Sequence, residues 1–175
     1  MIKPQKAIFL DRDGVLIYAP TNSYGKPKSI KTKSEIRFSK GIKSFCKIFK
    51  KKNFLLIMIT NQPEYSLKKN TKKNIEEINR HVKRILNLDD IFVCYSNDEN
   101  NFYRKPNPGM LLEAKSKYNI LIKKSYFIGD RWRDIDAGNK IGCKTIFINR
   151  NYNEKLRTKP KIIIKKISQI YRFII

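Results

Sequence analysis

Two aspartates, Asp11 and Asp13, stand two residues apart directly after the apolar run Lys6–Leu10. Side chains alternate along an extended segment, so both carboxylates face one side while Arg12 faces the other. Two carboxylates this close repel each other unless a cation lies between them or one is protonated. Hard oxygen ligands suit Mg²⁺, which also binds substrate phosphate. The pair therefore indicates a site for Mg²⁺ that also binds the phosphate of a substrate.

Further polar residues supply what phosphoryl chemistry needs. Asp130 offers a third oxygen for the cation, and we expect Asp134 to hold that group from outside the ligand set. Lys105 and Arg104 carry positive charge for a phosphoryl group, whose own charge is spread over its equatorial oxygens. Thr60 adds a hydroxyl, and it shares backbone N–H groups for phosphate with the residue that follows it.

These residues all follow apolar runs, which alternate with helical patterns. Ile42, Phe45, Cys46 and Phe49 recur at helical spacing, whereas Phe54–Ile59 is continuously apolar, as in a strand buried on both faces. Strands are expected at 6–10, 54–59, 91–95, 126–128, 144–148 and 162–164. Helices are expected at 40–52, 71–86, 133–141, near the C-terminus, and after Asn107 as cap with Pro108 in the first turn. A turn at 22–25 predicts a small hairpin within 15–30.

This alternation predicts a three-layer α/β fold with a central parallel sheet. In such sheets ligands bind at the carboxyl ends of the strands, which is where the polar residues cluster. We expect residues 1–175 to form a single domain without a large cap, because the segment between Asp13 and Thr60 is mostly used by a hairpin and one helix.

Composition narrows the class of protein. The chain has 175 residues, 41% of them hydrophobic, which excludes a disordered or fibrous protein. No apolar run approaches the roughly 18 residues of a membrane-spanning helix, so no membrane partner is expected. The first apolar stretch is too short for a signal peptide, and three scattered cysteines favour a reducing cytoplasm. We expect a monomer.

The formal net charge is +24, from 39 basic and 15 acidic residues. A basic surface attracts nucleic acid, acidic membranes or phosphorylated small molecules. The lysines are spread along a chain that is also rich in Ile and Asn, which favours codon bias as the main cause. A dedicated nucleic-acid binder usually concentrates its charge on one stripe.

Four motifs together resemble the haloacid dehalogenase superfamily of phosphatases. They are Asp11-Arg12-Asp13-Gly14-Val15, Thr60-Asn61-Gln62, Arg104-Lys105-Pro106 and Gly129 through Asp134. The chain is particularly similar to the branch of D-glycero-D-manno-heptose 1,7-bisphosphate phosphatases and histidinol-phosphatases, across about residues 6–150.

The resemblance implies roles for these residues. Asp11 would be the nucleophile that forms an aspartyl-phosphate, and Asp13 the general acid and then base. Thr60 would bind the phosphoryl group, and Lys105 would neutralise it. Asp130 would complete the Mg²⁺ site together with Asp11 and the backbone carbonyl of Asp13. We expect the substrate contacts to come from Asn61, Gln62, Arg104 and Arg131.

One loop departs from the family pattern. Heptose bisphosphate phosphatases carry three cysteines and a histidine for zinc just before the Arg-Lys-Pro motif, but here only Cys94 matches. Ser96 stands at the histidine position, and Asn101-Phe102-Tyr103 replaces the later cysteines. One thiolate cannot hold a tetrahedral zinc, so we expect no structural zinc. Packing of Phe102 and Tyr103 is expected to hold the loop instead.

The sequence thus predicts a Mg²⁺-dependent phosphomonoester hydrolase with a sugar phosphate as substrate, a heptose bisphosphate first and histidinol phosphate second. A nucleic-acid end phosphatase, or a basic nucleic-acid-binding module without turnover, stays open as an alternative that the charge would suit.

Overall fold

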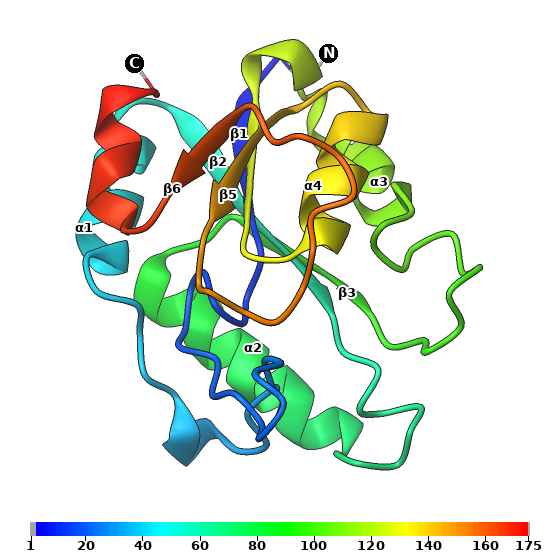
Figure 1. Cartoon of the computed structure of the whole chain (residues 1–175). Helices are drawn as coiled ribbons and strands as arrows, with labels where there is room; N and C mark the ends of the chain where they lie inside the picture. Colours follow the sequence, from blue (N-terminus) through cyan, green and yellow to red (C-terminus); the bar gives the residue numbers. More distant parts are fainter. Residues whose placement is uncertain (1–2, 175) are drawn as a thin grey trace.

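The computed structural model describes residues 3–174, in which six apolar segments form one parallel sheet (Figure 1). The strands are β1 (Lys6–Leu10), β2 (Phe54–Asn61), β3 (Asp90–Cys94), β4 (Tyr126–Gly129), β5 (Lys144–Ile148) and β6 (Ile162–Ile164). Their order across the sheet is β3-β2-β1-β4-β5-β6, and every neighbouring pair is parallel.

Helices cover both faces of this sheet. Alternate residues of β1 enter different cores, since Ile8 and Leu10 pack on one face while Ala7 and Phe9 pack on the other. The first core is covered by α1 (Ile42–Lys51), α2 (Lys72–Leu86) and the terminal 3₁₀ helix η3 (Ile167–Arg172). The second is covered by α3 (Gly109–Tyr118) and α4 (Trp132–Lys140). The three-layer α/β prediction is confirmed.

Two short 3₁₀ turns, η1 (Lys33–Glu35) and η2 (Ile122–Lys124), complete the elements of the described residues. The expected hairpin is reduced to one antiparallel bridge between Thr21 and Pro27. Its turn does form, because the Asn22 side chain accepts hydrogen bonds from the backbone N–H groups of Tyr24 and Lys26, at 3.0 and 2.9 Å.

The start of α3 differs from the prediction, because Pro108 and not Asn107 occupies the N-cap position. The Asn107 amide instead donates to the backbone carbonyls of Glu99 and Asn101, at 3.1 and 3.0 Å. Its Oδ1, the atom that a helix cap would use as acceptor, accepts instead from Lys140 Nζ on α4 at 3.4 Å, so a tertiary contact occupies the group that local signals assign to the cap.

The register of the central strands brings their carboxyl ends to one edge. Leu10 at the end of β1 pairs with Met58 on one side and with Ile128 on the other. β2 runs beyond this point to Asn61, so the residues after β1 and β4 and the last residues of β2 meet there. No helix within residues 3–174 has the length and hydropathy to span a bilayer.

Candidate active site

Three aspartates meet at the carboxyl edge of the sheet. The Asp11 amide donates to the carbonyl of Ile128 at 3.1 Å, which brings Asp11 beside Asp130 at the end of β4. Asp134, in the first turn of α4, completes the group, and one carboxylate oxygen from each residue lies within 4.8 Å of the others. The structure therefore unites two predicted ligands, Asp11 and Asp130, with a third carboxylate that was expected to act from farther out.

Two glycines make room for these carboxylates. A Cβ on Gly129 would lie 2.1 Å from the Cβ of Asp134, so β4 must end in a residue without a side chain. A Cβ on Gly14 would lie 1.7 Å from Asp130 Oδ2, and Gly14 also has a positive φ of 86°. Glycine at these positions lets two backbone segments close around the cluster.

Lys105 supplies the positive charge inside the cluster. Its buried Nζ donates to Asp11 Oδ1 and Asp134 Oδ1, each at 2.7 Å, and to the carbonyl of Ile59 at 2.9 Å. Burial raises the pKa of Asp11 to about 7, although the nearby Lys105 ammonium lowers it. Burial opposes the charge on Lys105, but the two aspartates outweigh it and raise the pKa of Lys105.

The residues present fit a hard divalent cation. Both carboxylate oxygens of Asp130 are enclosed and have no hydrogen-bond partner of standard geometry among the described residues, although the Tyr152 hydroxyl lies close enough to lower the pKa of Asp130. Burial and the neighbouring charge of Asp11 raise the pKa of Asp130 well above its usual value. Unpaired buried carboxylate oxygens are costly, and an all-oxygen donor set of this kind matches Mg²⁺.

The Asp13 carboxylate is held apart from this group. Its Oδ2 accepts from Arg12 Nε at 3.1 Å, from a terminal Arg12 nitrogen at 2.9 Å and from Gln62 Nε2 at 3.0 Å. Its Oδ1 is enclosed and without a hydrogen-bond partner among the described residues. One oxygen of Asp13 is thus fixed while the other stays available for a proton.

Arg12 is a residue whose importance the sequence analysis missed. Its guanidinium donates to Asp13, to Asn79 on α2 at 2.9 Å and to Gln62 at 2.8 Å. It is fully buried. An arginine between two acids was the available signal, yet the partner on α2 lies 67 residues away in sequence.

Of the polar residues at the end of β2, Asn61 lines the pocket, whereas Thr60 and Gln62 do not. Thr60 and Gln62 are buried and outside the pocket lining, with Gln62 Nε2 donating to Thr60 Oγ1 at 2.9 Å. Asn61 does line the pocket, but its side chain bonds the backbone of Lys105 twice, at 3.0 and 3.1 Å. These contacts make Gln62 and Asn61 positioning residues for Asp13 and Lys105.

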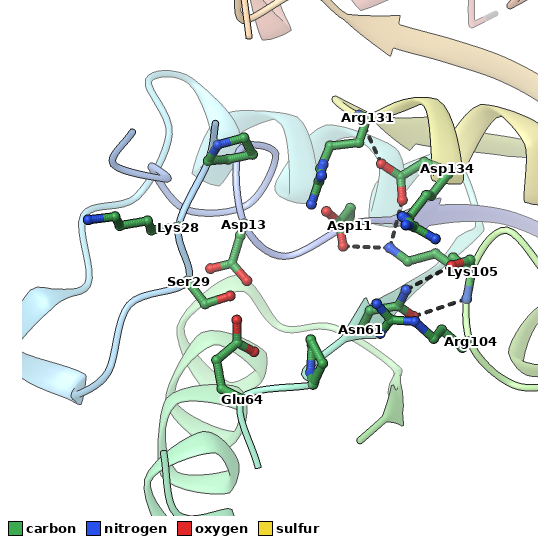
Figure 2. A pocket seen from close by; sticks show the side chains of 13 residues that line it. Asp11, Asp13, Lys28, Ser29, Asn61, Glu64, Arg104, Lys105, Arg131 and Asp134 are labelled. Carbon is green, nitrogen blue, oxygen red and sulfur yellow. Dashed lines mark hydrogen bonds and ion pairs between the residues drawn. The ribbon is translucent and has the colours of Figure 1, made fainter. Parts of the chain in front are cut away.

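A pocket opens in front of Asp11 and Asp13 (Figure 2). One wall is strongly basic, and three arginines contribute to it: Arg104, Arg131 and Arg133. Figure 2 places Lys28, Ser29 and Glu64 across from Arg104 and Arg131, and Pro27 and Pro63 also belong to the lining. Arg104 and Arg131, the two arginines predicted to contact substrate, both line this pocket.

Acidic residues orient these arginines. Arg131 forms an ion pair with Glu154, whose carboxylate accepts from its Nε at 3.0 Å. Glu99 pairs with Arg133 and, at 3.3 Å, with Arg104. Glu99 and Glu154 lie outside the four motifs, so no spacing rule identifies them.

The loop 96–104 is ordered by polar contacts. Arg104 donates to the carbonyl of Ser96 at 2.9 Å, and Cys94 Sγ donates to Asn101 Oδ1 at 3.7 Å. The expected packing of Phe102 and Tyr103 is limited to an edge-to-face contact between the two rings, whose centroids lie 5.5 Å apart, and the two residues are 54% and 45% exposed. The hydrogen bonds of Arg104 and Asn101 take the place of an aromatic core in this loop.

Comparison with known proteins agrees with this geometry. A family model described as polynucleotide kinase 3 phosphatase matches residues 6–144. A D-glycero-beta-D-manno-heptose-1,7-bisphosphate 7-phosphatase of Helicobacter pylori is 33% identical over 145 residues, covering 79% of each chain. The histidine biosynthesis bifunctional protein HisB of Campylobacter jejuni is 33% identical over 148 residues, covering 80% of this chain and 40% of that protein.

A solved structure shares the fold. It is the D,D-heptose 1,7-bisphosphate phosphatase of B. bronchiseptica, crystallised with magnesium and phosphate. The TM-score is 0.80 at 21% sequence identity, and the match covers 96% of this chain and 99% of that one.

Proposed function

The chain belongs to the polynucleotide kinase 3 phosphatase family, within the haloacid dehalogenase superfamily of phosphatases, and from this membership we propose that it hydrolyses a sugar phosphate. The proposed substrate is D-glycero-D-manno-heptose 1,7-bisphosphate, the substrate class named for the Helicobacter pylori relative. The observation that carries the proposal is the placement of Asp11, held by Lys105, in a pocket that Arg104, Arg131 and Arg133 also line.

We propose a reaction in two steps. An oxygen of Asp11 attacks phosphorus, the bond to the leaving oxygen breaks, and protonated Asp13 donates its proton to that oxygen. Asp13 then takes a proton from water, whose oxygen attacks phosphorus and releases Asp11. Lys105 offsets the phosphoryl charge next to Asp11. Asp11, Asp130 and the Asp13 backbone carbonyl would hold Mg²⁺, which supplies further charge stabilisation when bound.

A substrate panel tests the proposal. Phosphate release from the heptose bisphosphate, from other sugar phosphates, from histidinol phosphate and from 3′- and 5′-phosphorylated oligonucleotides should be fastest for the heptose bisphosphate. The similarity to HisB makes histidinol phosphate the second expectation. Faster hydrolysis of an oligonucleotide at physiological salt would contradict the proposal.

The nucleic-acid alternative has its own observations, namely the description of the matching family model and the net charge of +24. The dependence of kcat/KM on salt concentration distinguishes the two functions. Binding to a phosphate backbone weakens steeply as salt rises, because counterions are released, whereas a small sugar phosphate makes few phosphate contacts. We expect kcat/KM to fall only modestly between 50 and 200 mM salt, a range in which a multi-phosphate contact loses ~1,000-fold.

Activity should require Mg²⁺, and the purified protein should hold no zinc. The cluster of Asp11, Asp130 and Asp134 offers only oxygen, and the zinc ligands of the loop are missing apart from Cys94. Chelation with EDTA should abolish phosphate release, and added Mg²⁺ should restore it. Metal analysis provides the second measurement, and one tightly held zinc per chain would contradict the expectation.

Arg104→Lys should reduce kcat/KM for the heptose bisphosphate about tenfold more than for p-nitrophenyl phosphate, because a planar guanidinium binds phosphate at two points and an ammonium cannot. The Arg104 Nε is enclosed and without a partner among the described residues, so it offers a spare donor. Steady-state kinetics on both substrates measure the effect. Equal losses would limit Arg104 to general electrostatics and to its hold on Ser96.

We further propose that the enzyme acts in the cytoplasm as a monomer. The three cysteines are free and buried, and burial raises the pKa of both Cys46 and Cys143 to about 12. Such thiols are unreactive, which suits a reducing compartment.

A further inference from the structure

Glu64 differs from the other carboxylates of the pocket, Asp11, Asp13 and Asp134, because each of those forms an ion pair whereas Glu64 forms none with the described residues. It lines the pocket two residues after Gln62, and its Oε2 is enclosed without a hydrogen-bond partner in the part of the chain that the structure describes. Its own carbonyl accepts from the backbone N–H groups of Lys69 and Asn70, at 2.7 and 3.1 Å. The loop is therefore anchored while the carboxylate is left unpaired.

The Glu64 carboxylate points into the pocket, away from the arginines. Figure 2 shows it turned toward Ser29 and Asp13, across the pocket from Arg104 and Arg131. The Lys28 side chain on the same wall extends away from it, and no ion pair joins the two. The pocket thus has a cationic wall on one side and a carboxylate with a neighbouring hydroxyl on the other.

The arginine side and the Glu64 side of the pocket differ in charge, so they would bind different parts of a substrate. Phosphate groups are stabilised by the arginines, whereas a phosphate beside Glu64 would be repelled. Asp13, the proposed acid for the leaving oxygen, lies on the Glu64 side. The group that leaves with that oxygen is therefore the part of the substrate that Glu64 contacts.

We propose that Glu64 and Ser29 form a hydroxyl-binding subsite for a polyhydroxylated leaving group. This inference rests on the proposed function and specifies which part of the substrate is recognised where. A carboxylate accepts hydrogen bonds from hydroxyls, and a serine hydroxyl both donates and accepts, which matches adjacent hydroxyls of a polyol. A second phosphate of the substrate must then lie on the arginine wall.

A cationic leaving group is the competing ligand, because an ammonium would also satisfy Glu64. Arg104, Arg131 and Arg133 in the same lining would repel an ammonium that came close to them. A neutral polyol incurs no such repulsion and still meets the unpaired oxygen.

The test compares Glu64→Gln with the wild type on the heptose bisphosphate, p-nitrophenyl phosphate and histidinol phosphate. The ratio of kcat/KM for the heptose bisphosphate to that for p-nitrophenyl phosphate should fall about tenfold, because a charged acceptor for hydroxyls is replaced by a weaker neutral one. Glu113→Gln, an exposed residue of α3, makes the same charge change and should leave the ratio at its wild-type value. Glu64→Ala should lower the ratio at least as much as Glu64→Gln.

The outcomes distinguish a failure of the subsite from a failure of the proposed function. A wild type that prefers the heptose bisphosphate, together with an unchanged ratio in Glu64→Gln, overturns the subsite and leaves the proposed function standing. A wild type that prefers p-nitrophenyl phosphate or an oligonucleotide overturns the proposed function and the polyol subsite together. If histidinol phosphate suffers the largest loss in Glu64→Gln, the partner is an ammonium and the hydroxyl subsite is wrong.

Discussion

Asp11→Asn should lower phosphate release by a factor of at least about 1,000 while the protein unfolds at nearly its wild-type temperature. In the proposed mechanism an Asp11 oxygen forms the bond to phosphorus, and an amide is too weak a nucleophile to do so. The fold should tolerate the change, because asparagine keeps an oxygen for the Lys105 ammonium, which donates to Asp11 Oδ1 at 2.7 Å. Burial disfavours the Asp11 charge, so a neutral amide offsets part of the lost ion pair.

Phosphate release from the heptose bisphosphate and from p-nitrophenyl phosphate measures the effect, with thermal unfolding as the check on the fold. Glu113→Gln again serves as the matched control, since it removes one negative charge from an exposed position on α3. Release within a few fold of the wild type would remove Asp11 from the nucleophile role. A large drop in unfolding temperature would show that the carboxylate is needed for stability.

Much of the fold could be predicted because each strand is a continuous apolar run that is bounded by polar residues. The bounds of β1, β5 and β6 agree with the prediction, and β2 extends by only two residues. The meeting of Asp11 and Asp130 follows from the parallel sheet alone, since carboxyl ends of parallel strands share one edge. Local pattern and topology sufficed for these features.

The supporting contacts could not be predicted in this way. Arg12 donates a hydrogen bond to Asn79 on α2, and Arg131 donates one to Glu154, which lies 23 residues away along the chain. Side chains that position catalytic groups are chosen by three-dimensional proximity, which neither periodicity nor a motif encodes. Gln62 is another example, because its amide donates a hydrogen bond to Asp13 and the residue does not line the pocket.

Local signals also failed where a tertiary partner competed for the same group. Asn107 has the residue type of a helix cap, but its Oδ1 accepts from Lys140 on α4 and Pro108 occupies the cap position. Its amide nitrogen donates to two carbonyls of the loop 96–104. The same loop was expected to depend on Phe102, whose aromatic character suggested packing. Backbone carbonyls in that loop needed donors, and Arg104 and Asn107 met this need.

Lys105→Met should lower kcat/KM by ~100-fold or more and also destabilise the protein by ~3 kcal/mol. The buried ammonium contacts Asp11 and Asp134 at 2.7 Å each, so its removal leaves two carboxylates without their cation. Asp130 adds a third carboxylate close by, and mutual repulsion rises further. Methionine fills a similar volume, which separates the loss of charge from the loss of packing.

Chemical denaturation and phosphate release measure the two effects in one preparation. Lys115→Met, at an exposed position of α3, removes the same charge and should change neither quantity by more than a small amount. Added Mg²⁺ should return part of the lost stability, because a bound cation would restore positive charge among the carboxylates, but it should not return the rate. The phosphoryl group would still lack the ammonium that offsets its charge beside Asp11. Stability and rate both near wild type would mean that Asp11 and Asp134 need no lysine, and the charge balance argued for this cluster would be wrong.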